Sequence, residues 1–324
     1  MIRYILKRIL QAVPLLLVIS FIVFTLIHLA PYDAIDAQIT SNMSQEEINI
    51  LREQSGLNKP FLIQYVDWLG QILSGNFGHS LVTHNSVGEE ILAKIPNTIS
   101  LVLPAYITAL IIAIVLGLLA AANKGKWQDK FIDAVASLGI ATPSFWIAMI
   151  FIYVLGYQLN LFPIIGMHTI GKEDDFGDFL SHFIMPYLTL TIVFFAELTR
   201  YVRSSALSQT NEEYVVVQQA FQATKTQIFT RHIIKNVLIP VITQVGMSLP
   251  MLVTGAIITE TVFSWPGIGP YITQATRALD YPIIMAVMLL SATLVIVGNL
   301  ISDILYSIVD PRIRRGGKED EKIY

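Results

Sequence analysis

The sequence predicts an all-α membrane protein with six transmembrane helices. Hydrophobic residues make up 54% of its 324 residues and charged residues only 14%, and the mean hydropathy is +0.60, which is too apolar for a soluble domain of this length. A helix needs about 20 residues to cross a hydrocarbon core of about 30 Å. Six apolar runs are long enough, at residues 9–30, 98–122, 132–155, 184–202, 237–263 and 283–308. We therefore expect one transmembrane domain over residues 1–324.

The distribution of basic residues predicts the orientation of these spans. Lys and Arg are retained on the cytoplasmic side during membrane insertion. Of the 21 basic residues, 16 lie in the two termini or in the loops predicted to be on the same side of the membrane as the termini. The five on the other side are Arg52, Lys59, Lys94, Lys172 and Arg277. We expect both termini and the loop 204–236 to be cytoplasmic.

Charge and cysteine content exclude some functions. The net charge of −3 argues against nucleic-acid binding, which needs an excess of clustered basic residues. The chain has no cysteine, and therefore no disulfide or thiolate chemistry. Five of the six histidines fall on the outer side, but none forms an i, i+4 pair, so we expect solvated loop histidines and no metal site.

The first apolar run resembles a signal peptide in its basic start, but we expect it to be a retained span. Its apolar stretch is longer than a typical signal core, and His28 stands where a cleavage site would need a small residue.

The predicted extracytoplasmic segment, residues 31–97, carries helix signals of its own. Ser44 and Glu47 have the spacing of a capping box. Residues 61–73, FLIQYVDWLGQIL, place apolar side chains on one helix face, as in a helix at the membrane interface. This segment could serve as a docking platform or as a lid of packed loops. In the second outer loop, the acidic run at residues 173–178 is expected to be solvated.

The loop 204–236 predicts two short amphipathic helices. Thr210 with Glu213, and Thr224 with Gln227, have the spacing of capping boxes. Helices this short are unstable alone in water, so each must bury its apolar face against a partner. That partner is either the end of the protein's own bundle or another subunit.

Several motifs resemble one family in order and spacing. They are HLAP at the end of the first span, GLNKPFLIQYVDWLGQILSGNFGHS, ATPSFW, EYVVVQQAFQ with RHIIKNVLIPVIT, ETVFSWPGIG, DYP and DPRIR. Together they resemble the permeases of ABC importers of the dipeptide, oligopeptide and nickel type. The resemblance covers nearly the whole chain, and residues 98–308 would form the permease core.

The resemblance implies partners and a coupling site. The chain would pair with a second homologous permease in the cytoplasmic (inner) membrane of a bacterium or archaeon, with two cytosolic ABC ATPases and an extracytoplasmic substrate-binding protein. ATP and Mg²⁺ would bind the ATPases, because this chain has no phosphate-binding loop and no cofactor of its own. The loop 204–236 would contact an ATPase and transmit its closure to the fifth span. The residues expected to serve this coupling are Glu213, Tyr214, Val217, Ala220, Phe221, Gln222, Arg231, His232 and Pro240.

One departure affects this loop. Gln222 stands where the family commonly has glycine, which removes a residue that adopts a positive φ without cost. Gln222 and Ala223 could still make the turn between the two helices.

Ionisable residues within spans are costly and need a partner. Glu197 is expected to pair with Arg200 or Arg203 near the cytoplasmic rim. Glu260, which precedes SWPGIG, could line the substrate pathway together with Trp265, or could hold the outer loop by hydrogen bonds.

The sequence thus predicts a peptide-importing ABC permease subunit that is not itself an enzyme. Import of nickel or a metal chelate is the alternative within the family. An ion-coupled secondary transporter would need charged residues near the middle of the membrane, whereas the charges here lie toward span ends. An intramembrane hydrolase would need a motif such as G-x-S-x-G or H-E-x-x-H, and neither occurs.

Overall fold

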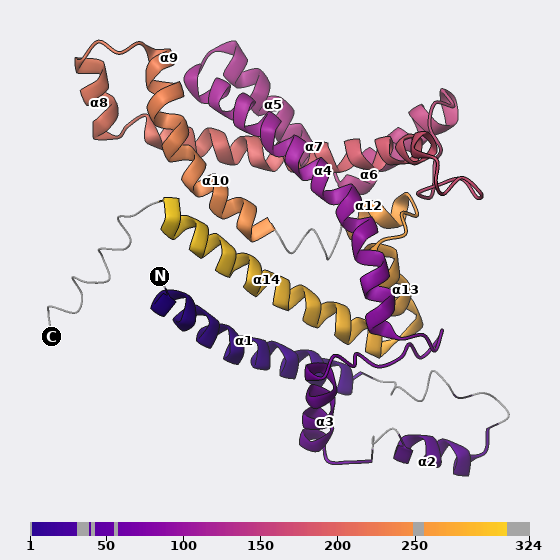
Figure 1. The fold of residues 1–324 in the computed structure, drawn as a ribbon. Helices are drawn as coiled ribbons and strands as arrows, with labels where there is room; N and C mark the ends of the chain where they lie inside the picture. The colour runs from indigo at the N-terminus through magenta and orange to yellow at the C-terminus, as the bar shows by residue number, and fades with distance from the viewer. Residues whose placement is uncertain (1, 31–38, 40–42, 55–57, 249–255, 310–324) are drawn as a thin grey trace, which may run out of the picture.

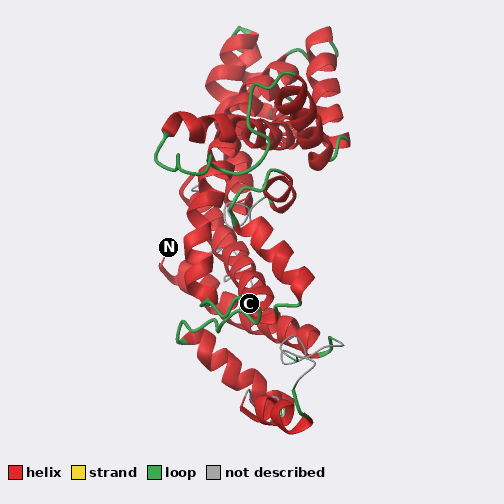
Figure 2. Ribbon diagram, turned by 90° about the vertical axis from the view of Figure 1, so that its right-hand side faces the viewer, coloured by secondary structure: helices red, strands yellow, loops and turns green. Residues whose placement is uncertain are grey.

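The computed structural model describes residues 2–30, 39, 43–54, 58–248 and 256–309. Within these ranges every regular element is a helix, apart from an isolated bridge between His79 and Ser86 (Figures 1 and 2). Four helices are long and apolar enough to cross a membrane: α1 (Ile2–His28), α4 (Val87–Ala122), α7 (Phe176–Gln209) and α14 (Tyr281–Val309). They correspond to the first, second, fourth and sixth predicted spans, and confirm an all-α membrane protein.

The third predicted span is not one straight helix. It consists of α5 (Trp127–Ala141), α6 (Ser144–Phe151) and the π-helix η1 (Ile152–Gln158), with a bend of 95° between α5 and the α6–η1 segment. Pro143 explains the break, because proline disfavours a helical conformation in the residue before it. Thr142 is accordingly extended, with φ −95° and ψ 119°. The span predicted over residues 132–155 is therefore broken at Pro143 into two helical segments.

The fifth predicted span is described in two parts. α10 (Ile234–Ser248) and α12 (Ile257–Val262) cover its beginning and end, and residues 249–255 lie outside the described part of the chain. A further helix, α13 (Ile268–Ala278), follows α12 and leads into α14.

The segment between the first two spans contains α2 (Gln45–Gln54) and α3 (Phe61–Leu73), and α3 coincides with the predicted helix. The capping box before α2 is confirmed: the Ser44 backbone N–H donates to Glu47 Oε2 at 2.7 Å, and the Glu47 N–H donates to Ser44 Oγ at 3.2 Å. These bonds hold the pKa of Glu47 below its usual range, the bond from the Ser44 backbone most strongly. α3 packs on α1 through aromatic rings, including Phe24 against Trp68 with centroids 5.3 Å apart.

The loop predicted to be the second outer loop is more ordered than its acidic composition suggests. Asp178, near the start of α7, accepts hydrogen bonds of 2.6 Å from both the backbone N–H and the hydroxyl of Thr169. Its side chain is only 8% exposed and lies 3.5 Å from Nδ1 of His182. The prediction of a solvated acidic run is therefore wrong for Asp178, because this carboxylate closes the loop onto α7.

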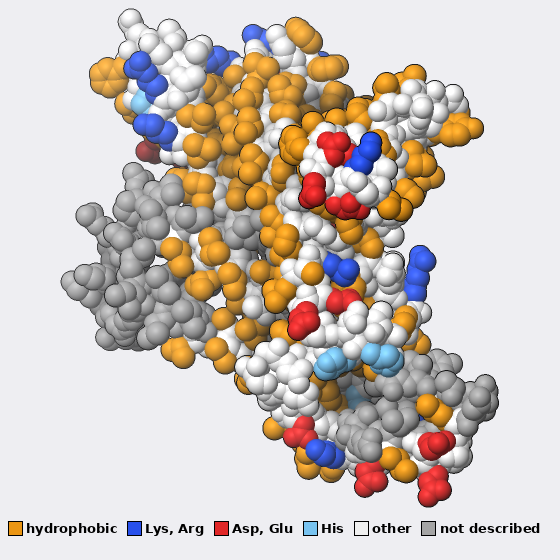
Figure 3. Space-filling view, turned by 45° about the vertical axis from the view of Figure 1, so that its right-hand side comes forward, with side chains coloured by type: hydrophobic (Ala, Val, Ile, Leu, Met, Phe, Trp, Pro, Cys, Tyr) orange, Lys and Arg blue, Asp and Glu red, His pale blue; other side chains and the backbone are white. Residues whose placement is uncertain are grey.

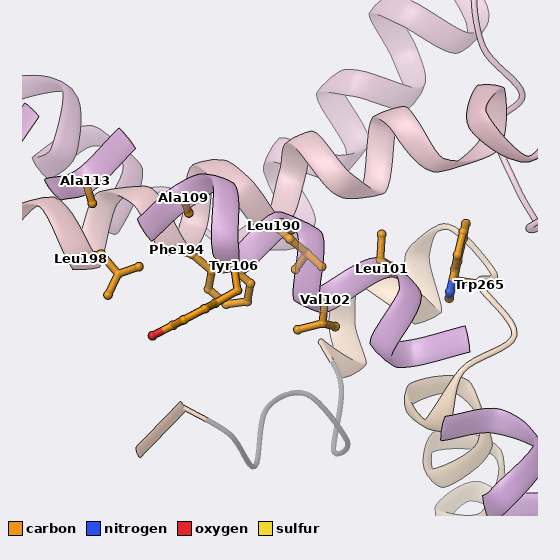
Figure 4. Packing of buried hydrophobic residues seen from close by; sticks show 10 residues of the cluster. Leu101, Val102, Tyr106, Ala109, Ala113, Leu190, Phe194, Leu198 and Trp265 are labelled. Atoms are coloured by element: carbon orange, nitrogen blue, oxygen red, sulfur yellow. The ribbon is translucent and has the colours of Figure 1, made fainter. Parts of the chain in front are cut away.

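The pairing of α4 with α7 forms the centre of the bundle. Buried side chains of the two helices interleave along their length, among them Leu101, Tyr106, Phe194 and Leu198, and Trp265 extends this cluster (Figure 4). Figure 3 shows hydrophobic side chains over much of the face formed by the long helices, as expected for a surface in contact with lipid. The core thus runs parallel to the spans and connects the two ends of the molecule.

Small residues permit the close approach of α4 and α7. A Cβ atom on Gly117 of α4 would lie 2.7 Å from Val202 Cγ1 and 3.1 Å from the backbone N of Arg203. Both atoms belong to α7, so the helices could not keep their present separation.

We predict that Gly117→Ala destabilises the protein by about 1–3 kcal/mol, because the added methyl group overpacks this helix contact. Thermal denaturation in detergent should show a lower melting temperature. The matched control is Gly70→Ala in α3, where a Cβ atom would meet nothing within 4 Å. This control should be neutral or slightly stabilising, since alanine favours a helix over glycine. A Gly117→Ala variant as stable as wild type would contradict the close-packing argument.

Candidate functional site

The predicted helical loop after α7 is present as a helical hairpin. It contains α8 (Glu213–Ala220), a tight turn, α9 (Lys225–Ile228) and the π-helix η2 (Phe229–Ile233), which continues into α10. In Figure 1 the hairpin projects beyond α7 and α10, at the end of the molecule away from α2 and α3. We call residues 210–233 the α8–α9 hairpin.

One of the two predicted capping boxes in this hairpin exists. Thr224 Oγ1 accepts from the backbone N–H of Gln227 at 3.3 Å, and the Gln227 side chain accepts from the N–H of Thr224 at 2.9 Å. The predicted box of Thr210 with Glu213 is wrong. α7 continues to Gln209, so Thr210 ends that helix and its hydroxyl donates to the carbonyl of Leu207 at 2.7 Å.

The turn between α8 and α9 is made by Gln222 in the left-handed region, with φ +59°. Its N–H donates to the carbonyl of Gln219 at 2.9 Å, and the next N–H, of Ala223, donates to the carbonyl of Gln218 at 3.0 Å. For a residue with a Cβ atom, this conformation costs about 1 kcal/mol or more. The hairpin therefore keeps a turn suited to glycine although the sequence supplies glutamine.

One face of the hairpin is anchored to the bundle. Val215 of α8 and Ile228 of α9 are each 3% exposed, and Ile233 is completely buried. They pack with side chains near the ends of α4, α7 and α10, namely Ala121, Val202, Ala206, Val237 and Val241. The end of the protein's own bundle is thus one partner of the two short helices.

Other side chains of α8 and of its C-cap have no such cover among the described residues. Phe221 is 80% exposed, Val216 61% and Val217 49%. Of the other predicted coupling residues in the hairpin, four are exposed and two are partly buried. The exposed ones are Glu213, Ala220, Gln222 and Arg231, and the partly buried ones are Tyr214 and His232. The structure therefore brings one apolar, accessible strip together at the tip of the hairpin.

Pro240 lies away from this strip, inside α10, and is partly buried. Its carbonyl accepts a hydrogen bond of 3.1 Å from the hydroxyl of Tyr201 on α7. Proline at this position removes one helical donor and leaves its neighbourhood easier to bend. Pro240 is therefore positioned where the hairpin joins the membrane part of the fold.

A partly buried ion pair fixes the same end of the bundle. Arg203 on α7 donates to both oxygens of Asp129 on α5, from Nε to Oδ1 at 2.6 Å and from Nη2 to Oδ2 at 3.1 Å. The Gly125 N–H also donates to Oδ2 at 2.8 Å. The predicted pairing of Glu197 with Arg200 or Arg203 is wrong, because Arg203 points to Asp129 and Glu197 has no ion pair within the described ranges. No local spacing in the sequence reveals a pair separated by 74 residues.

Glu260 and Trp265 lie in a second cluster, near the α2–α3 end. Glu260 is 0% exposed, and its Oε2 accepts from the backbone N–H of Gly269 at 2.7 Å. Trp265 is also 0% exposed, and its indole N–H donates to the carbonyl of Asn97 at 2.8 Å. Thr98 on α4 accepts from the N–H of Ile268 at 2.9 Å. These bonds, which we call the outer latch, join α4, α12 and the start of α13.

The outer latch bears on the two alternatives for Glu260. The hydrogen bonds of Glu260 fit the alternative in which this side chain holds the outer loop. Because both side chains are inaccessible in this conformation, a role for Glu260 and Trp265 in lining the pathway stays a prediction. A neighbouring contact was missed from the sequence: Ser80 donates to Oδ2 of buried Asp280 at 2.5 Å, which joins the GNFGHS and DYP motifs. Asp280, directly before Tyr281 and Pro282, could be recognised in the sequence as the start of a helix. No feature of the sequence around Ser80 indicated that it would bind Asp280.

Two family models match the chain. Residues 113–315 match the binding-protein-dependent transport system inner membrane component, and residues 1–102 match the N-terminal part of such membrane components. The first match covers more than half of the chain. The protein belongs to this family, as the motifs indicated.

Curated relatives match over nearly the full length. The chain is 38% identical to the oligopeptide transport system permease protein AppB of Bacillus subtilis, over 97% of this chain and 99% of that protein. It is 34% identical to the metal-staphylopine import system permease protein CntB of Staphylococcus aureus, over 98% and 100%. It is 31% identical to the glutathione transport system permease protein GsiC of Salmonella typhimurium, over 97% and 99%. The chain is a permease subunit of an ABC importer, a multi-pass bacterial membrane protein and not an enzyme.

We predict that Gln222→Gly stabilises the protein relative to Gln222→Ala by about 1 kcal/mol, because only the alanine keeps the Cβ that opposes a positive φ. For a protein of this size the melting temperatures should differ by about 2 °C. Comparing the two variants with each other removes the loss of the glutamine side chain from the result. Equal melting temperatures would show that the turn is not held in the left-handed region.

We also predict that Glu260→Leu costs more stability than Glu260→Gln. Leucine leaves the buried N–H of Gly269 without an acceptor, which costs about 1–3 kcal/mol, whereas the amide of glutamine offers a carbonyl oxygen in the same place. Thermal denaturation of the purified transporter should rank wild type, Gln and Leu in descending order. A Leu variant as stable as the Gln variant would exclude the latch.

Proposed function

We propose that this permease pairs with a second, homologous permease to form a pathway for peptides delivered by an extracytoplasmic binding protein, with two cytosolic ABC ATPases supplying the energy. The peptide assignment is supported by relatives whose names specify oligopeptides, dipeptides and glutathione. Import of a metal chelate is the second candidate, supported by the 34% identity to the metal-staphylopine permease.

We propose the six-span arrangement with both termini in the cytoplasm. Four spans are the long helices, the bent α5–α6–η1 unit would be the third in order, and α10 with α12 would be the fifth. The excess of basic residues at the termini and in the loop 204–236 supports this orientation. Residues 31–97 would then be extracytoplasmic, residues 98–308 the permease core, and the whole chain a single transmembrane domain.

The α8–α9 hairpin is the proposed contact with an ATPase. The observation that carries this proposal is the division of the hairpin into a buried face, with Val215 and Ile228, and an exposed apolar strip of Val216, Val217 and Phe221. Full burial of one such side chain contributes about 1.5–3 kcal/mol to the free energy of binding. Binding of the strip in a hydrophobic groove would therefore be favourable. Exposed Glu213 and Arg231 would border the contact.

The anchoring of the hairpin explains how movement would reach the membrane. Because Ile228 and Ile233 pack with Val237 and Val241 at the start of α10, displacement of the hairpin would displace α10 with it. Pro240 and its contact with Tyr201 lie on this path. Closure of the ATPases would thereby favour one of two arrangements of α10 against α7, which is the element an alternating-access transporter needs.

We predict that Phe221→Asp abolishes stimulation of ATP hydrolysis and transport, because a charge would have to enter an apolar groove. Phe221→Leu should keep most of both activities. The measurement is ATP hydrolysis by the transporter in proteoliposomes, with and without ligand-loaded binding protein. The matched control is Ile170→Asp in the second outer loop, where the isoleucine is 98% exposed. The control should behave like wild type. Unchanged stimulation in Phe221→Asp would exclude the proposed contact.

A further inference from the structure

A pocket of about 370 Å³ with a mixed polar and apolar lining opens on the surface where the beginning of α4 meets α13 and the loop 263–267. Lys94 from α4 and Arg277 from α13 are part of its wall, together with Ser264, Thr273 and Gln274. None of its lining residues is acidic. A pocket with two cationic side chains and several hydroxyl or amide groups is suited to bind a carboxylate.

The two cations are available to a ligand. Neither Lys94 nor Arg277 has an ion pair within 4 Å in the part of the chain that the structure describes, whereas Lys59 pairs with Asp67 at 2.6 Å. Lys94 Nζ instead lies 5.1 Å from the centre of the Tyr271 ring, in a cation–π contact that holds the ammonium group at the pocket. The acid one turn before Lys94, Glu90, accepts a hydrogen bond from Asn85.

Lys94 and Arg277 line the same pocket although basic residues are few on the proposed extracytoplasmic side. In the proposed orientation only five of the 21 Lys and Arg residues are extracytoplasmic, and two of these five line one pocket. Figure 3 shows a few Lys and Arg side chains in the middle of this face, with Asp or Glu side chains close to them and histidine side chains below. An exposed site of positive charge therefore exists within a surface whose other basic groups are dispersed.

The floor of the pocket is formed by buried residues that are held in place. Trp265 and Gly267 line it and are buried. The outer latch fixes this floor, through the bond from the Trp265 indole to the Asn97 carbonyl and the bond from Gly269 to Glu260. The pocket thus has a fixed floor against which a docking group can bind.

We propose that this pocket is a docking site for an acidic side chain of the extracytoplasmic binding protein, whose carboxylate binds between Lys94 and Arg277. The inference rests on the proposed function and orientation, and adds to them the chemistry of the contact. Charged pairs at the rim of an interface mainly accelerate association and set its salt dependence. The pocket would therefore determine how readily the binding protein engages the permease, and would leave the later coupling to the ATPases unchanged.

The test uses the complete transporter in proteoliposomes and the binding protein purified with its bound ligand. Lys94→Gln and Arg277→Gln should each raise the binding-protein concentration for half-maximal ATPase stimulation by about tenfold at low salt, and by less at high salt. Basal and maximal ATPase rates and the melting temperature should be unchanged. Lys94→Arg should retain most of the affinity. Lys59→Gln, which removes a basic group from the same proposed side without touching the pocket, should have no comparable effect.

Two outcomes would overturn the inference. The first is an unchanged half-maximal concentration in both Gln variants. The second is normal engagement of the binding protein with a transport defect only for peptides that have a free C-terminal carboxylate, which would assign the pocket to the substrate. If wild type itself is not stimulated by the loaded binding protein, the proposed function fails, and that result is distinct from either outcome. Restoration of Arg277→Glu by an acid-to-lysine change on the binding protein would identify the partner residue.

Discussion

The close packing of α4 against α7 is the contact on which the rest of the molecule depends. In a bilayer, lipid chains are as apolar as the side chains, so helices associate through close van der Waals contact and small residues at the interface. Gly117 against Val202 provides that contact, and Ala109 and Ala113 continue it along α4. With 36 residues at 1.5 Å each, α4 extends about 54 Å, which exceeds the about 30 Å thickness of a hydrocarbon core.

Both functional regions are attached to this helix pair. At one end Thr98 of α4 takes part in the outer latch, which holds Trp265 and the floor of the basic pocket. At the other end Ala121 of α4 and Val202 and Ala206 of α7 hold the buried face of the α8–α9 hairpin. A binding protein at one end and an ATPase at the other would thus act on one common element, so that each could bias the same rearrangement.

The sequence predicted those features that depend on local patterns. Apolar runs identified the spans, FLIQYVDWLGQIL gave the bounds of α3, and the capping boxes at Ser44 and Thr224 are present. Features that depend on distant partners were missed or wrong. Arg203 binds Asp129, 74 residues away, and no spacing rule favoured that partner over Glu197. Thr210 closes α7 because that helix outlasts its apolar run, and Pro143 bends the third span by 95°, which the length of the apolar run alone did not reveal. The exposed strip on α8 was predictable as an amphipathic pattern, but which of its faces the bundle covers is decided by tertiary packing.

The most direct test of the central claim, that the α8–α9 hairpin contacts an ATPase, is site-specific crosslinking, and it is simple because the chain has no cysteine. A Phe221→Cys variant is labelled with a thiol-reactive photo-crosslinker, assembled with the ATPase subunits and illuminated; a Val215→Cys variant, at a position only 3% exposed and covered by the protein's own bundle, serves as the control. We expect a crosslink from position 221 to an ATPase subunit that changes in yield with ATP, and none from position 215. Crosslinks from position 221 that remain within the permease, or labelling of this position from outside intact cells, would contradict the account.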